Sequence, residues 1–229
     1  MKLTNINWLR GLMAACLYLL FLPSSYCQKV NISRDINVRN DLSYDILHAE
    51  DNVLFFRDKG SEFYFDIFDE NMEFKRSVEI LFEERRPAIE NIHAIDSFIQ
   101  MVYAYREGPD YVSRMVRYDK KVNLIDSMEL IRGPFLFSPG EMRSVLSDDM
   151  SKLALFTIDK ARLFAVVVDT RKMEILTAGD IEVPDYRLYD QFQEAGVSNL
   201  GQLFFLFEKN NESWDKEKHM MRLVMSELG

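Results

Sequence analysis

Apolar residues along most of the chain follow the period of β-strands rather than that of helices. Short continuous apolar runs recur at 52–56, 98–105, 152–158 and 202–207. They are rich in Phe, Val, Ile and Tyr and are too short for most helices, so they predict strands buried on both faces. Another short strand precedes each run, and a polar hinge follows it. The pattern therefore predicts an all-β chain.

An aspartate recurs at a fixed spacing in three of these repeats, at Asp69, Asp119 and Asp169. When Asp69 is aligned with Asp119, the apolar residues that follow agree position by position, and their strict alternation predicts a half-exposed strand. After Asp169 the register shifts by one, which predicts a turn one residue longer. Because Asp can bond the backbone that follows it, we interpret all three aspartates as turn residues rather than as calcium ligands.

Three or four strands in about 45–50 residues, repeated four times, match the blades of a β-propeller. The blades are expected at approximately 41–80, 89–130, 143–181 and 190–229, within one domain of residues 28–229. An irregular β-sandwich is the alternative fold, but it does not explain matching registers at fixed spacing. The sequence thus predicts an all-β protein with β-propeller-type repeats and about four blades.

About four blades is the lower end of the usual propeller range, and the last repeat lacks its fourth strand. Residues 29–38 have strand-like character and are expected to supply that strand and close the ring. Otherwise the chain is part of a larger or truncated propeller, and an open blade edge allows it to self-associate.

The third repeat carries a resemblance to a known family. Residues 146–177, "LSDDMSKLALFTIDKARLFAVVVDTRKMEILT", resemble the blade motif of TolB-type and WD-repeat-like propellers. Asp148 stands where that motif has Pro, and Met150 stands where it has Gly. The resemblance implies a propeller used for binding and transfers no catalytic residue. The matching residues are Ser147, Asp149, Lys152, Leu155, Phe156, Thr157, Val168, Asp169, Leu176 and Thr177.

Residues 1–27 have the features of a secretory signal: a basic start, an apolar stretch from Leu12 to Leu22, and small residues after it. The stretch is shorter than the roughly 20 residues that a bilayer span needs, so no integral span is expected after cleavage. We expect a secreted, periplasmic or cell-envelope protein that begins near Gln28. A lipid anchor on Cys27 or Cys16 is the alternative.

Charge and cysteine content narrow the function classes. Removing Lys2 and Arg10 with the signal takes the formal charge from −9 to −11. This balance argues against nucleic acid as a partner. The expected mature chain has no cysteine and the whole chain has three histidines, so neither disulfides nor a metal site are predicted, and no cofactor is expected.

The best candidate chemistry is a pair of histidines at the ends of two predicted inner strands. His48 in "HAED" and His93 in "HAID" look equivalent, with Asp51 and Asp96 close by. Facing one channel, these four residues would form the acid–base set of a hydrolase or lyase. The alternative is that both histidines bond neighbouring backbone.

The leading hypothesis is a non-enzymatic binding or scaffold module that presents propeller loops to a protein or glycan. Tyr186, Tyr189 and Trp214 are the candidate contact residues, because they fall in predicted loops rather than in strands. The hydrolase or lyase at the channel mouth is the second hypothesis.

Overall fold

The computed structural model describes residues 30–84, 87–134, 142–159, 162–183, 191–209 and 221–226. The chain divides into two units, Met1–Ile32 and Ser33–Gly229, and the fold described below belongs to the second unit.

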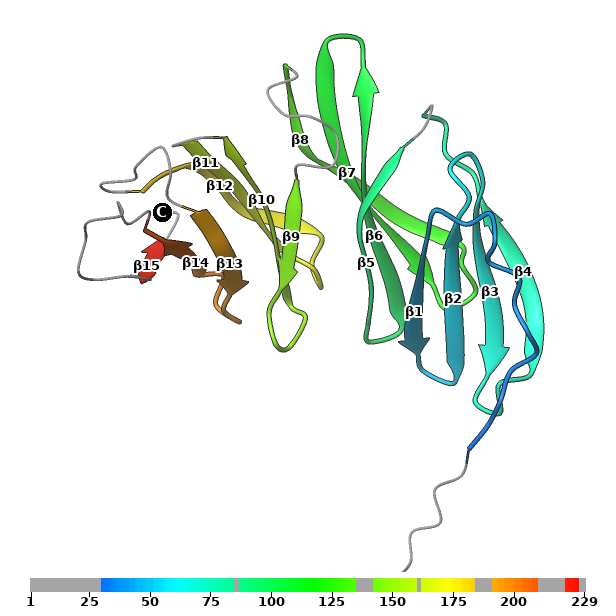
Figure 1. The fold of residues 1–229 in the computed structure, drawn as a ribbon. Coiled ribbons are helices and arrows are strands. Elements are labelled where there is room, and N and C mark those ends of the chain that lie inside the picture. The colour runs from blue at the N-terminus through cyan, green and yellow to red at the C-terminus, as the bar shows by residue number, and fades with distance from the viewer. Residues whose placement is uncertain are drawn as a thin grey trace, which may run out of the picture. The chain divides into compact units, whose positions relative to one another are not determined.

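The described residues form fifteen β-strands, as the alternating apolar pattern predicts (Figure 1). No helix in the described ranges is long and apolar enough to cross a membrane. The strands are β1 (Ser43–Ala49), β2 (Asn52–Asp58), β3 (Phe63–Asp69), β4 (Phe74–Ile80), β5 (Ala88–Ile95), β6 (Phe98–Glu107), β7 (Asp110–Asp119), β8 (Leu124–Pro134), β9 (Arg143–Leu146), β10 (Lys152–Asp159), β11 (Arg162–Asp169), β12 (Glu174–Glu182), β13 (Gln191–Val197), β14 (Leu203–Glu208) and β15 (Met221–Ser226).

The strands form four antiparallel sheets, and within each sheet they are ordered as they occur in the sequence. The first three sheets have four strands each: β1–β4, β5–β8 and β9–β12. The fourth sheet has three strands, β13–β15, within the described part of the chain. Each sheet is therefore one meander of the kind that forms a propeller blade.

Hydrophobic cores lie between consecutive sheets. One core joins the first sheet to the second, another joins the second to the third, and a further one joins the third to the fourth. The opening strands of neighbouring sheets also meet, β1 with β5, β5 with β9 and β9 with β13. Middle strands must thus be apolar on both faces, which explains the continuous apolar runs in the sequence.

Each recurring aspartate lies in the turn between the third and fourth strands of its sheet. One carboxylate oxygen of Asp69 accepts hydrogen bonds from the backbone N–H groups of Asn71 (2.9 Å) and Glu73 (3.0 Å). Asp119 and Asp169 accept equivalent backbone bonds in the next two sheets. These bonds hold the turn closed, as in an Asx-turn.

The turn in the third sheet is one residue longer than the other two. A backbone bond links Met72 N to Asp69 O, three residues apart, whereas Met173 N bonds to Asp169 O, four residues apart. A β-bulge lies just after the turn in all three sheets, with its extra residue on the fourth strand: Lys75, Ile125 and Leu176. The register shift seen in the sequence is the extra residue of the third turn.

Residues 33–42, which we call the strap, lie against the outer face of the first sheet, the face that points away from the second sheet (Figure 1). The Arg34 guanidinium lies 3.5 Å from the centre of the Phe74 ring on β4. Leu42 N donates to Asp58 O at the end of β2 (2.6 Å). The structure thus differs from the prediction that residues 29–38 close the fourth sheet, because residues 30–38 form no strand and the strap contacts the first sheet.

Candidate functional site

The outer face of the first sheet carries two charged residues where the other sheets carry apolar core. Arg57 on β2 is equivalent by ladder position to Tyr103 on β6, since each lies five residues after the first residue of its strand. Asp66 on β3 is equivalent to Val116 on β7 and Val166 on β11, both buried in cores between sheets. The outer face of the first sheet therefore carries a charged pair among apolar side chains such as Phe55 and Phe68.

The strap supplies Asp41, which forms an ion pair with Arg57 on this face. Arg57 Nε lies 2.7 Å from Asp41 Oδ2, and Arg57 Nη2 lies 3.2 Å from Asp41 Oδ1, so the pairing is bidentate. Arg57 also donates to Asn37 O (2.6 Å) and to Asp66 Oδ2 (3.4 Å). The Asp41 side chain is only 1% exposed. This network fixes the strap on the sheet, and the hydrogen bond to Asp41 raises the pKa of Arg57.

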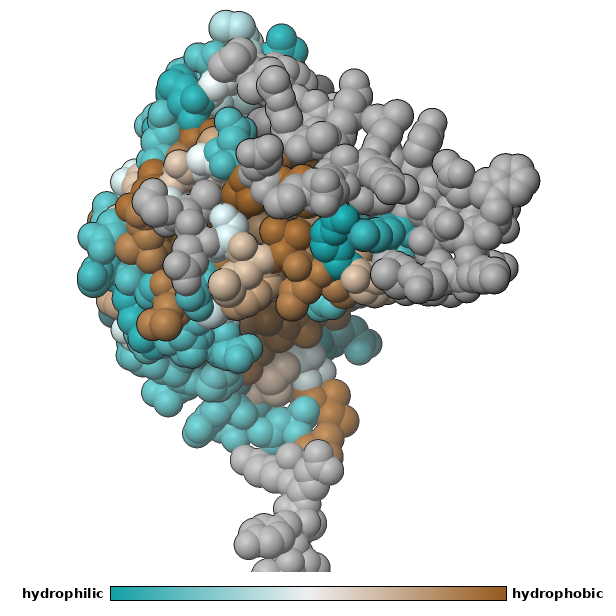
Figure 2. Space-filling view, turned by 90° about the vertical axis from the view of Figure 1, so that its left-hand side faces the viewer, coloured by the Kyte–Doolittle hydropathy of each residue, from teal (hydrophilic) through white to brown (hydrophobic). Residues whose placement is uncertain are grey.

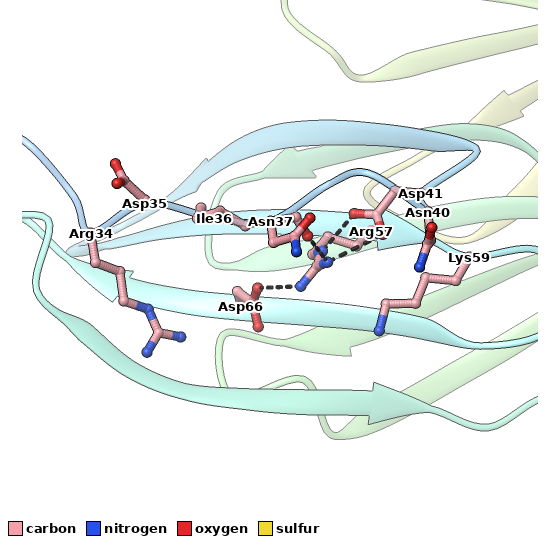
Figure 3. Close-up of a pocket in the computed structure, with 9 residues that line it drawn as sticks. All are labelled: Arg34, Asp35, Ile36, Asn37, Asn40, Asp41, Arg57, Lys59 and Asp66. Atoms are coloured by element: carbon pink, nitrogen blue, oxygen red, sulfur yellow. Dashed lines mark hydrogen bonds and ion pairs between the residues drawn. The ribbon is translucent and has the colours of Figure 1, made fainter.

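A pocket of about 410 Å³ lies between the strap and the sheet (Figure 3). Arg34 and Lys59 lie at its two ends, with Arg57 and Asp66 between them. The Lys59 ammonium lies 4.5 Å from the centre of the Tyr64 ring, and both end cations therefore rest on aromatic rings. The lining residues are Arg34, Asp35, Ile36, Asn37, Asn40, Asp41, Arg57, Lys59 and Asp66.

The lining combines three basic side chains, three carboxylates and two amides. The formal charges of these side chains cancel. Fixed donors and acceptors lie next to one another, which suits a ligand whose groups both donate and accept hydrogen bonds. The volume falls within the range of small-ligand sites, which is roughly 300–1,000 Å³.

The two candidate histidines are not equivalent in the structure. The positive-φ turn residues Glu50 and Asp96 correspond to each other, and His48 lies two residues before the first whereas His93 lies three before the second. A shift of one residue turns a side chain to the other face of its strand. His48 is exposed on the outer face of the first sheet, and His93 is buried and faces the third sheet. The structure does not bring the two imidazoles together.

His93 belongs to a buried hydrogen-bond network between the second and third sheets. Its Nδ1 lies 2.8 Å from Asn91 Oδ1, and its Nε2 lies 3.0 Å from Gln100 Oε1. Gln100 Nε2 in turn donates to Thr170 O, and Asn91 Nδ2 donates to Ser144 Oγ. Burial lowers the pKa of His93 to about 4, so the ring is neutral at pH 7.

A neutral ring has a single N–H, yet both nitrogens of His93 face an amide oxygen. The bond to Thr170 O fixes the orientation of Gln100, so Nε2–H of His93 donates to Gln100. Turning the Asn91 amide then lets its NH₂ group donate to Nδ1, with the Ser144 hydroxyl donating to the amide oxygen in place of its long bond to Glu90 O (3.3 Å). These roles satisfy the network and give His93 a structural position.

The carboxylates predicted to accompany the histidines lie in exposed turns. Asp51 follows Glu50 at the end of β1, and Asp96 pairs with Arg171 at 3.4 Å. In the described ranges, no group of three His, Cys, Asp or Glu residues is arranged to hold a metal ion. The predicted contact residues Tyr186, Tyr189 and Trp214 lie outside the described residues.

Three of the residues that carry the family resemblance, Ser147, Asp149 and Lys152, lie at the β9–β10 turn. Asp149 accepts hydrogen bonds from the Ser147 hydroxyl (2.8 Å), the Ser151 hydroxyl (2.7 Å) and the Ser151 N–H (2.9 Å). These bonds lower the pKa of Asp149 to about 2. Lys152 Nζ lies 3.1 Å from Asp169 Oδ2 and joins this turn to the β11–β12 turn. The motif is therefore a turn-stabilising network.

The sequence analysis predicted contact residues in loops and a histidine pair, and it did not predict the strap pocket. Arg57 directly follows the apolar run 52–56, and Asp66 interrupts the apolar stretch from Phe63 to Phe68. A charge at each of these positions, absent from the other repeats, could have marked the outer face of the first blade.

Comparison with known proteins gives structural likenesses alone. No family model and no curated protein matches the chain. The chain is similar to the Dos1 propeller (11% identity, TM-score 0.45, 72% of this chain and 43% of that one). It is similar to the Nup133 β-propeller domain of Vanderwaltozyma polyspora (9% identity, TM-score 0.47, 87% and 59%). It is also similar to an uncharacterized protein of Listeria monocytogenes EGD-e (12% identity, TM-score 0.44, 86% and 52%).

The chain thus spans 43% to 59% of the length of these solved structures. Its class follows from its own sheets, which repeat one meander and share a core with each neighbour. The protein is an all-β protein with four propeller-type blades in its described residues.

Proposed function

We propose that the protein is an exported, non-enzymatic binding module, related to TolB-type propellers, that recognises a neutral glycan in the strap pocket. The observation that carries this proposal is the composition of the pocket, in which three basic and three acidic side chains cancel around two amides. Sugar hydroxyls donate and accept hydrogen bonds at once, so they can pair with both kinds of group.

Preorganisation supports the same proposal. Arg57 is held by Asp41, Asp66 and the backbone of Asn37, so the centre of the pocket is ordered before a ligand arrives. Binding to a fixed site loses less conformational entropy than binding to loops that must first be ordered. Lys59 and Asn40 line the pocket without a hydrogen bond to Arg57, and they are the residues we assign to ligand contact.

The test is isothermal titration calorimetry of the purified chain against a panel of neutral oligosaccharides. For the glycan that binds, we expect Lys59→Ala and Asn40→Ala each to raise Kd about tenfold, the cost of losing one good hydrogen bond. Lys75→Ala is the matched control, because this exposed lysine of β4 pairs with Asn52 and does not line the pocket. If neither pocket variant changes the affinity, the glycan does not bind in the strap pocket. The next hypothesis is then a protein partner bound by the loops.

The hydrolase or lyase alternative has its own measurement. No specific observation favours it, since His48 is exposed on the first sheet and His93 faces the third. The measurement is turnover of the bound glycan by the wild type and by His48→Ala. If the wild type turns the glycan over and the variant binds it without turnover, the protein is an enzyme and the binding proposal is wrong.

A further inference from the structure

One carboxylate oxygen in the lining of the strap pocket has no hydrogen-bond partner among the described residues. The Asp66 side chain is 7% exposed, and its Oδ2 lies 3.4 Å from Arg57 Nη1. This distance is long for a bond between two charged groups, which is usually about 2.7–2.9 Å. In the part of the chain that the structure describes, this is the one hydrogen bond of the carboxylate, so Oδ1 accepts none. Buried polar atoms are normally bonded, so an open acceptor here calls for an explanation.

The repeat gives no structural reason for a charge at this position. The residue equivalent to Asp66 is Val116 in the second sheet, Val166 in the third and, by ladder position, Val224 in the fourth. Exposure does not demand a charge either, because the exposed face of the fourth sheet is hydrophobic, with Leu223 67% exposed (Figure 2). A buried charge where the repeat otherwise places valine is the informative exception.

Arg57 leaves one hydrogen-bond donor open beside this acceptor. A guanidinium has five N–H groups. The Nε–H and one Nη2–H bond to Asp41, the other Nη2–H bonds to Asn37 O, and one Nη1–H faces Asp66 Oδ2. Within the described residues, the second N–H of Nη1 is therefore unused. An open donor and an open acceptor thus lie on two adjacent side chains of the pocket lining (Figure 3).

This pair selects for a group that donates and accepts a hydrogen bond at once. A ligand carboxylate has no hydrogen for Asp66, and a ligand ammonium has no lone pair for Arg57. A hydroxyl can accept from Arg57 Nη1–H and donate to Asp66 Oδ1 with the same oxygen atom. A sugar ring presents such hydroxyls on a rigid frame, so the pair fits one free hydroxyl of a sugar.

We propose that Asp66 determines the specificity of the strap pocket, by requiring a free hydroxyl at one ring position of the bound glycan. This inference rests on the glycan-binding function proposed above. A site that bonds a hydroxyl discriminates against a ligand without it, because the buried polar groups of the site then stay unpaired. Glycans that are deoxygenated or O-methylated at that position should therefore bind poorly.

The test is titration calorimetry of the full chain with neutral trisaccharides of glucose, galactose and mannose, and with each monodeoxy analogue of the one that binds. For the wild type, removal of one hydroxyl should raise Kd about tenfold or more, as expected for one hydrogen bond to a charged group. Asp66→Val should raise Kd for the parent trisaccharide by a similar factor. In that variant, removal of the same hydroxyl should have no further effect.

Glu79→Gln is the matched control for this titration. It removes one negative charge from the same sheet, at an exposed position of β4 that does not line the pocket. We expect this variant to bind the parent trisaccharide and its analogues as the wild type does. Equal effects of Glu79→Gln and Asp66→Val would show that only the charge of the sheet matters, which would contradict the inference.

Stability without ligand gives a readout that a purely structural role would not. We expect the free energy of unfolding of Asp66→Val in urea to equal or exceed that of the wild type. The reason is that valine removes a buried carboxylate with an open oxygen, while Arg57 keeps its partner Asp41. A less stable Asp66→Val would instead assign Asp66 a structural role. Asp66→Asn, of nearly the same shape, is the second variant if Asp66→Val does not fold, and it should raise Kd severalfold.

Two further results would overturn the inference alone. If every monodeoxy analogue binds as tightly as the parent, Oδ1 of Asp66 holds only an ordered water. If Lys59→Ala weakens binding and Asp66→Val does not, the glycan lies in the pocket without contacting Asp66. A wild-type chain that binds no trisaccharide and no other neutral oligosaccharide would contradict both this inference and the proposed function.

Discussion

At the scale of single residues, His93 has the largest consequence for the pH dependence of stability. The unfolded ring takes up a proton near its ordinary pKa of 6.5, but burial delays protonation of the folded ring until about pH 4. As the pH falls from about 6.5 to about 4, the unfolded state binds the proton first and folding stability declines. The full loss from this one group is about 3 kcal/mol.

Replacing His93 with Gln should remove that dependence. At pH 7 we expect His93→Gln to be less stable than the wild type by about 1–3 kcal/mol, because the Asn91 and Gln100 bonds are disturbed. The gap should close as the pH falls to 4.5, since the variant has no ring to protonate. Urea denaturation at pH 7, 5.5 and 4.5 measures this difference in the free energy of unfolding. His48→Gln, at an exposed position, is the control, and a gap independent of pH would contradict the argument.

The histidines also show why the sequence misled at this scale. The segments "HAED" and "HAID" align by amino-acid identity, which pairs His48 with His93. The backbone gives a different alignment, because Glu50 and Asp96 are the equivalent turn residues with positive φ. Backbone conformation is not visible in letters, and an error of one residue reverses the face of a strand. The aspartate turns were easier to interpret, because Asp69, Asp119 and Asp169 act on the backbone immediately after them.

At the scale of elements, the β9–β10 turn contains a backbone strain that a substitution can test. Met150 has φ 56° where the equivalent residue of the β13–β14 turn, Gly201, has φ 90°. A side chain in the left-handed region costs about 1–2 kcal/mol. The TolB-type motif has Gly at the position of Met150, and the positive φ at this position explains that preference.

We expect Met150→Gly to stabilise the protein by about 0.5–1 kcal/mol, after allowing for the greater freedom of Gly in the unfolded chain. The Met150 side chain is largely exposed, so little packing is lost. Met150→Ala is the control, because it removes the side chain but keeps the unfavourable φ. The free energy of unfolding in urea separates the two, and equal values would show that strain at this turn is negligible.

The sequence predicted the strands well, but it did not predict the position of the strap. Strands β2, β6, β10 and β14 were predicted because burial on both faces leaves a continuous apolar run. Residues 29–38 were predicted to close the fourth sheet, whereas the strap of residues 33–42 contacts the first sheet, where its position depends on one side-chain pairing, Asp41 with Arg57, sixteen residues apart. Such a pairing has no periodicity, so the strap pocket could not be predicted from the pattern.

At the scale of the whole molecule, the first testable property is processing of the N-terminus. The basic start, the apolar stretch Leu12–Leu22 and the small residues after it predict export and cleavage near Cys27. Mass spectrometry of protein recovered from the envelope or the medium should show a mature end near Gln28. Leu19→Arg should block processing by charging the apolar stretch. An intact Met1 on exported protein, or a diacylated cysteine, would contradict ordinary cleavage.

The order of the sheets has a further consequence, for the way the chain reaches its fold. Among the fifteen described strands, every hydrogen-bonded pair joins neighbours in sequence, and each core joins one sheet to the next. A chain that emerges N-terminus first, from a ribosome or a translocon, can therefore complete one sheet and then use it as the template for the next. Folding can then advance from one sheet to the next during synthesis, and the strap, which precedes β1 in sequence, can cover the outer face of the first sheet before the later sheets are made. A nascent chain stopped after β12 would expose the apolar residues of the third sheet that the fourth sheet buries, among them Leu163, Ala165 and Val167.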